Sequence, residues 1–112
     1  MKVLVAEDDP ISRRVLQTFL ERWGYQVVAA SDGAAAWRLF QHDHFPVVVS
    51  DWMMPEMDGL ELLRRIRSSP RPGYVFTILL TARTQKEDLI EGMAAGADDF
   101  LTKPFDRREL IA

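Results

Sequence analysis

Five short apolar runs recur along this chain, and each is followed by a segment in which apolar residues have helical spacing. The runs cover residues 2–6, 26–30, 47–50, 76–80 and 100–102. Strands that alternate with helices need crossover connections, and these connections make neighbouring strands parallel. Two of the runs, 47–50 and 76–80, are apolar almost throughout, which is typical of strands covered on both faces. The pattern therefore predicts an α/β fold with a five-stranded parallel sheet.

The segments between these runs carry start and stop signals for helices. In the first, Asp9 suits the N-cap, Pro10 suits the first turn and Gly24 suits the end. Helices are expected at 10–23, 33–41, 59–68 and 85–95, with a fifth that begins at 106 and is truncated at 112. The expected buried face of the first helix contains Ile11, Val15, Leu16, Phe19 and Trp23. Right-handed crossovers favour a doubly wound, flavodoxin-like sheet with strand order 2-1-3-4-5.

Composition narrows the class of protein. The 112 residues suffice for one domain, and the net charge of −3 gives no global attraction to nucleic acid or anionic membranes. The absence of cysteine excludes disulfides and thiolate metal sites. No apolar stretch approaches the roughly 18 residues of a membrane span. Because the first strand begins almost at the N-terminus, no signal peptide is visible, and a cytoplasmic location is expected.

Polar residues follow four of the five runs. They are Glu7, Asp8 and Asp9 after the first run, then Asp51, Thr81 and Lys103. Each could serve as a local cap, but the carboxyl ends of parallel strands meet at one edge, where ligands bind. The clustered carboxylates would repel one another without a cation. Oxygen ligands alone favour Mg²⁺, with Mn²⁺ or Ca²⁺ as alternatives. A carboxylate beside a coordinated phosphoryl group can act as a nucleophile and form an acyl phosphate.

In their order and spacing, four motifs resemble the receiver domain of bacterial two-component response regulators. They are Val3–Pro10, Val49–Gly59, Leu79–Ala82 and Gly96–Phe105. The resemblance implies that residues 1–112 form a single receiver domain, the N-terminal part of a longer regulator. It also implies a signalling switch that catalyses only its own phosphorylation and dephosphorylation, not a turnover enzyme.

The resemblance assigns roles to individual residues. Asp51 would be the phospho-acceptor. Mg²⁺ would be held by Glu7, Asp8 and Asp51 together with the backbone carbonyl of Met53. The phosphoryl group would be contacted by Thr81 and Lys103, and Phe100 would change conformation together with Thr81 as a switch. Met53 and Arg83 are candidate modulators of hydrolysis. Met53 is apolar where the family often has a polar residue, and Arg83 has a solvent-facing role as its alternative.

Partners follow from the same resemblance. A sensor histidine kinase or a phosphotransfer protein would donate the phosphoryl group, and an output domain or effector protein would receive the signal, without direct nucleic-acid or membrane binding. A homodimer through the fourth helix, fifth strand and fifth helix is a further expectation, with a solvated charged face as the alternative. Its candidate ion-pair residues are Asp98, Asp99, Arg107, Arg108 and Glu109.

The sequence disfavours three other functions. A haloacid-dehalogenase-like phosphatase would need a second aspartate at position 53, where this chain has Met53. A flavin or nucleotide binder would need a phosphate-binding loop where Glu7, Asp8 and Asp9 stand. A pseudo-receiver that only binds a partner is disfavoured because all five site residues are retained.

The sequence also predicts the burial of several side chains outside the site. We expect Trp23 and Trp37 in the core, Trp52 partly exposed, and residues 42–44, which contain two histidines and an aspartate, in an exposed loop rather than a metal site.

Overall fold

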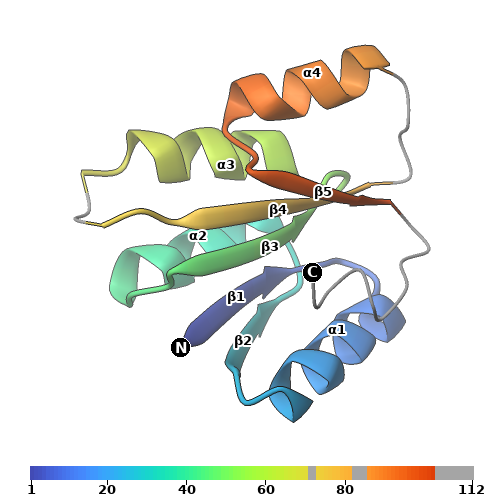
Figure 1. The fold of residues 1–112 in the computed structure, drawn as a ribbon, viewed down its shortest axis with the longest axis vertical. Coiled ribbons are helices and arrows are strands. Elements are labelled where there is room, and N and C mark those ends of the chain that lie inside the picture. Colours follow the sequence, from blue (N-terminus) through green and yellow to red (C-terminus); the bar gives the residue numbers. More distant parts are fainter. Residues whose placement is uncertain (71–72, 82–85, 103–112) are drawn as a thin grey trace.

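The chain folds into a parallel sheet with helices on both faces (Figure 1). The computed structural model describes residues 1–70, 73–81 and 86–102. The strands are β1 (Lys2–Ala6), β2 (Gln26–Ala30), β3 (Val47–Asp51), β4 (Phe76–Thr81) and β5 (Asp99–Thr102). The helices are α1 (Pro10–Arg22), α2 (Gly33–His42), α3 (Gly59–Ser68) and α4 (Lys86–Ala95). The expected truncated fifth helix, residues 106–112, lies outside the described residues. No helix in the described part is long and apolar enough to cross a membrane.

The sheet has the predicted order β2-β1-β3-β4-β5, and every neighbouring pair is parallel. The doubly wound fold prediction is therefore confirmed. Element boundaries differ by one residue in several places. The differences that matter lie at the carboxyl edge, where β3 extends to Asp51 and β4 extends to Thr81. Both side chains are thus fixed by sheet pairing rather than by a loop.

Strand β1 shows how both faces of the sheet are covered. Val3 and Val5 pack with Leu16 and Leu20 of α1 on one face. The alternate residues Leu4 and Ala6 belong to a second cluster with side chains of α2 and α3. Figure 1 shows α1 on one side of the sheet and α2, α3 and α4 on the other. This two-sided cover explains why β1 is almost continuously apolar.

The expected buried face of α1 is partly wrong. Leu16 and Leu20 are buried, but Ile11 is 75% exposed and Val15 is also exposed. A helix touches a sheet along a narrow stripe, and here the apolar face is wider than that stripe. The outer residues instead line a shallow surface groove along the helix, together with Arg14.

The tryptophan expectations also need correction. Trp52 is only 2% exposed and packs with Leu60, Leu63 and Leu79. It was expected to be partly exposed because it follows the site strand, but its side chain packs against α3. Trp23 and Trp37 are half-buried and pack against the core.

The two histidines and the aspartate at positions 42–44 are exposed, as expected. The aspartate, Asp43, forms an ion pair with Lys2. This segment closes the connection from α2 to β3.

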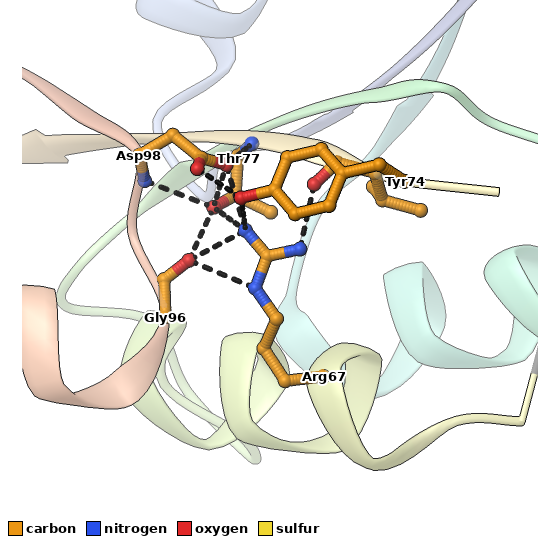
Figure 2. A network of polar contacts seen from close by, with 6 residues as sticks. Arg67, Tyr74, Thr77, Gly96 and Asp98 are labelled. Atoms are coloured by element: carbon orange, nitrogen blue, oxygen red, sulfur yellow. Dashed lines mark hydrogen bonds and ion pairs between the residues drawn. The ribbon is translucent and has the colours of Figure 1, made fainter.

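At the amino ends of β4 and β5, Arg67 from the end of α3 ties three elements together (Figure 2). Its guanidinium donates to the carbonyls of Val75 at 2.6 Å and Gly96 at 2.7 Å, and it pairs with Asp98 at 2.7 Å. The Arg67 guanidinium also lies 4.7 Å from the centre of the Tyr74 ring, within range of a cation–π contact. We call Arg67, Tyr74, Thr77, Gly96 and Asp98 the amino-edge network.

Asp98 is held inside this network. It accepts hydrogen bonds from the Tyr74 hydroxyl and from the Thr77 backbone N–H at 2.8 Å. Burial alone would raise the pKa of Asp98, but the hydrogen bonds from Tyr74, Thr77 and Arg67 and the charge of Arg67 hold that pKa below its ordinary value. Asp98 is therefore paired within the chain rather than lying on a fully solvated charged face, while its part in interface ion pairs stays a prediction. Asp99 is exposed.

Candidate functional site

Three carboxylates meet at the carboxyl edge of the sheet. Oxygen atoms of Glu7, Asp8 and Asp51 all lie within 4.8 Å of one another. Asp8 is exposed, whereas Glu7 is fully buried and Asp51 is 7% exposed. Residues separated by more than forty positions are brought together because β1 and β3 are neighbours. We call these three residues the acidic cluster.

Asp51 is oriented by the chain that follows it. The backbone N–H of Trp52 lies 2.9 Å from Asp51 Oδ1 and 3.0 Å from the carbonyl of Leu80. Gly59 approaches from α3, where a Cβ would meet the carbonyl oxygen of Asp51 at 2.2 Å. The Gly59 N–H donates to the Trp52 carbonyl at 2.8 Å. Only glycine at position 59 leaves the end of β3 undisturbed.

The turn from β1 into α1 positions Glu7 and Asp8. The N–H of Glu7 donates to the carbonyl of Ala30 at 3.1 Å, which extends the pairing of β1 with β2. The carbonyl of Glu7 accepts a hydrogen bond from Arg13 Nη1 at 2.9 Å. Asp9 caps α1 by accepting from the N–H of Ser12. Of the three consecutive acids, Asp9 is therefore the helix cap, while the other two enter the acidic cluster.

Arg13 was missed by sequence analysis. Its position at the fourth residue of α1 carries no motif by itself. A signal was nevertheless present in Pro10, which has no N–H and cannot close a turn onto the carbonyl of Glu7. The missing N–H leaves room for a donor from a later residue of the helix, and Arg13 provides one.

Thr81 lies at the same edge as the acidic cluster. It is buried, and it directly follows Leu80, which pairs with Asp51. Met53 lies in the loop after β3, with its side chain exposed. Lys103 and Arg83 lie outside the described residues, as do Arg107, Arg108 and Glu109.

Phe100 of β5 is half-buried against the cluster that contains Trp52 and Leu79. A Cβ placed on Gly92 of α4 would lie 2.6 Å from Cε1 of the Phe100 ring. The ring therefore lies directly against the backbone of α4. The structure places Phe100 between this helix and β4, with Thr81 at the end of β4.

The donor set of the acidic cluster fits a hard divalent cation. Three carboxylates within 4.8 Å concentrate negative charge in a partly buried site. Burying like charges together is unfavourable unless a cation or other positive group offsets them. Mg²⁺ binds through one or two carboxylates and keeps positions for water and phosphoryl oxygens. The cluster can therefore hold such an ion next to the carboxylate of Asp51.

Comparison with known proteins agrees with this geometry. Residues 3–112 match the family model described as the response regulator receiver domain. The chain belongs to this family. The acidic cluster fits the phosphorylation pocket of a receiver domain. The match supports the receiver reading over the phosphatase and flavin-binding alternatives.

Individual relatives show the same relationship. The chain is 42% identical over 110 residues to the transcriptional regulatory protein CseB of Streptomyces coelicolor, covering 98% of this chain and 46% of that protein. The receiver domain of Francisella response regulator 1452 superposes with a TM-score of 0.90 at 41% identity, covering 98% and 89% of the two chains.

A third comparison concerns a receiver domain with a bound metal. The structure of the receiver domain of sensor histidine kinase PA1611 from Pseudomonas aeruginosa has a magnesium ion coordinated in the active-site cleft. It superposes on this chain with a TM-score of 0.89 at 33% identity, covering 98% of this chain and 90% of that chain. The chain spans less than half the length of the curated relatives it matches.

Proposed function

We propose that this receiver domain accepts a phosphoryl group on Asp51, with Mg²⁺ held by Glu7, Asp8, Asp51 and the backbone carbonyl of Met53. The observation that carries the proposal is the convergence of the acidic cluster at the carboxyl edge, with Asp51 as the last residue of β3. The magnesium ion reported for the related Pseudomonas receiver domain supports the choice of metal. Mn²⁺ is an alternative ion with the same ligand preferences.

The transfer converts one phosphorylated side chain into another. A carboxylate oxygen of Asp51 attacks the phosphorus of a phosphohistidine, a P–O bond forms as the P–N bond breaks, and the departing imidazole takes up a proton. The backbone N–H of Trp52 holds Oδ1 of Asp51 at 2.9 Å and so fixes the plane of the carboxylate. Bound Mg²⁺ supplies positive charge that offsets the negative charge of the phosphoryl oxygens. Hydrolysis of the acyl phosphate later resets the domain.

The remaining assignments concern the signal. Thr81 and Lys103 contact the phosphoryl oxygens, and Thr81 moves together with Phe100 to change the surface around α4 and β5. Thr81 is buried at the carboxyl edge, and Phe100 packs against α4, which supports this coupling. Met53 and Arg83 modulate the rate of hydrolysis.

The partners are a sensor histidine kinase or phosphotransfer protein and an output domain or effector. We also propose a cytoplasmic location and an N-terminal position in a longer regulator. The greater length is supported by the curated relatives, of which the chain covers less than half. Self-association through α4, β5 and the following residues is part of the same proposal.

Phosphorylation by a small donor tests the proposal. Purified protein is incubated with Mg²⁺ and acetyl phosphate, and intact mass is measured for wild type, Asp51→Ala and Asp43→Ala. Asp43 is an exposed aspartate paired with Lys2 and serves as the matched control. Wild type and the control should gain one phosphoryl group, and Asp51→Ala none. Equal labelling of Asp51→Ala and wild type would refute the assignment.

A further inference from the structure

We propose that Arg13 is a positioning residue for the cation site, because its guanidinium holds the carbonyl of Glu7 and thereby fixes the turn that presents the Glu7 and Asp8 carboxylates. The inference rests on the proposed function, in which these carboxylates bind Mg²⁺. Its physical basis is the 2.9 Å hydrogen bond from Arg13 Nη1 to the Glu7 carbonyl oxygen.

The Glu7 carbonyl accepts a hydrogen bond from a side chain outside its own turn. In a tight turn the carbonyl of the first residue accepts from the N–H three residues later. That residue is Pro10, which has no N–H. Because Glu7 is fully buried, a carbonyl without a donor would be costly there. Arg13, half-buried on the second turn of α1, supplies the donor.

With Arg13 in place, both backbone polar groups of Glu7 are held. The N–H donates to the Ala30 carbonyl in β2, and the C=O accepts from Arg13 in α1. Glu7 is thus fixed on both sides, since the peptide unit before it is bonded to a strand and the peptide unit after it is bonded to a helix. Carboxylates that are held in place before the metal ion arrives bind it more tightly, because they lose less conformational freedom on binding.

A positioning role and a purely electrostatic role predict opposite effects on Mg²⁺ affinity. A guanidinium near the acidic cluster repels a divalent cation, so removing its charge alone should tighten Mg²⁺ binding. Removing a support of the Glu7–Asp8 turn should instead weaken Mg²⁺ binding. The neighbouring Arg14 provides the matched control, because it carries the same charge one residue later but is exposed and lines the groove on the outer part of α1.

The test measures Mg²⁺ affinity by tryptophan fluorescence for wild type, Arg13→Met, Arg13→Lys and Arg14→Met. Trp52 is the reporter because it directly follows Asp51 and its backbone N–H donates to the Asp51 carboxylate. We expect Arg13→Met to bind Mg²⁺ about 10-fold more weakly, as removal of a support behind a metal ligand does. Arg13→Lys should weaken binding about threefold, since the ammonium keeps a donor but not the planar fork. Arg14→Met should bind equally or up to about twofold more tightly.

A second readout separates positioning from a general loss of structure. Acetyl phosphate labelling of Asp51 is followed as a function of Mg²⁺ concentration. In Arg13→Met the half-saturating Mg²⁺ concentration should rise about 10-fold while the rate at saturating Mg²⁺ stays near that of wild type. Arg13→Lys, which keeps the charge and a donor, gives the same test in a milder variant should Arg13→Met not fold.

Two outcomes would overturn the inference. The first is Mg²⁺ affinity in Arg13→Met or Arg13→Lys that equals or exceeds that of wild type, in parallel with Arg14→Met. The second is a lowered saturating rate with an unchanged half-saturating concentration. If wild type itself bound no Mg²⁺ and gained no phosphoryl group, the proposed function would fail, and this inference with it.

Discussion

The molecule has two polar clusters at opposite edges of one sheet, and they are built in opposite ways. In the amino-edge network the guanidinium of Arg67 meets the carboxylate of Asp98 and backbone carbonyls at the ends of neighbouring elements. The acidic cluster gathers three carboxylates of one sign within 4.8 Å. The first combines complementary groups, and the second concentrates like charges.

This difference separates a cluster that stabilises the fold from one that is built for a ligand. When charged groups are partly buried with complementary partners, removing one partner is costly because the other is left without compensation. Like charges that are held together weaken the fold unless a cation or another positive group offsets them. The same type of substitution should therefore have opposite consequences at the two edges.

The largest expected effect is that of Arg67→Met. It removes the donors shared by Val75, Gly96 and Asp98 and leaves a partly buried carboxylate. We expect the free energy of unfolding, measured by urea denaturation, to fall by about 3 kcal/mol. The matched control is Arg65→Met, whose ion pair with Glu61 is exposed and should contribute less than about 1 kcal/mol. Equal losses in the two variants would show that the amino-edge network is not a stabilising cluster.

The sequence revealed the acidic cluster but not the amino-edge network. Apolar runs and strand order were sufficient to place Glu7, Asp8 and Asp51 together, because residues at strand ends converge in a parallel sheet. Arg67 instead reaches partners up to 31 residues away, at the far end of the strands. Its reach depends on the length of α3 and on the side-chain rotamer, and neither leaves a pattern in the sequence.

Apolar periodicity likewise identified helix α1 but not what covers each part of its face. Ile11 is exposed although it lies on the apolar side of the helix. Conversely, Trp52 is buried although it follows a site strand. Both outcomes depend on how far neighbouring elements extend, which local spacing does not specify.

A pair of Asp→Asn substitutions tests the comparison directly. Asp98→Asn removes the charge that faces Arg67 and should lower the free energy of unfolding by about 2 kcal/mol. Asp8→Asn relieves repulsion in the acidic cluster and should raise it by about 0.5 kcal/mol without Mg²⁺, while weakening Mg²⁺ binding. Both are measured by urea denaturation in a metal-free buffer. Effects of the same sign would break the distinction between the two edges.

The contribution of Asp98 should also depend on pH. Its pKa in the folded protein is lowered, because the hydrogen bonds and charge of its partners outweigh the effect of burial. A lowered folded-state pKa gives stability that is present above the unfolded-state pKa of about 3.9 and is lost as pH falls through the folded-state value. The difference in unfolding free energy between wild type and Asp98→Asn should therefore be constant above about pH 5 and shrink below about pH 4. A difference that persists at lower pH would contradict this assignment.

The smallest expected effect is spectroscopic and concerns Tyr74. The hydrogen bond from its hydroxyl to Asp98 raises the pKa of Tyr74 above the ordinary tyrosine value. The stabilisation from this bond should be present below about pH 10 and be lost as pH rises through the folded-state pKa. In a Tyr25→Phe background Tyr74 is the one remaining tyrosine, so ultraviolet absorbance follows it alone. Adding Asp98→Asn should move its titration to lower pH, and an unchanged midpoint would remove the hydrogen bond from the network.

The closeness of Gly92 to Phe100 limits which substitutions these two positions can accept during evolution. A methyl group on Gly92 would lie 2.6 Å from the Phe100 ring, so the two positions share one volume. A larger residue at 92 is compatible with this packing only if residue 100 becomes smaller or its ring turns away. Among diverging relatives the sizes of these two residues should therefore change together and in opposite directions. A Gly92→Ala, Phe100→Leu double substitution should accordingly be milder than the sum of its single changes.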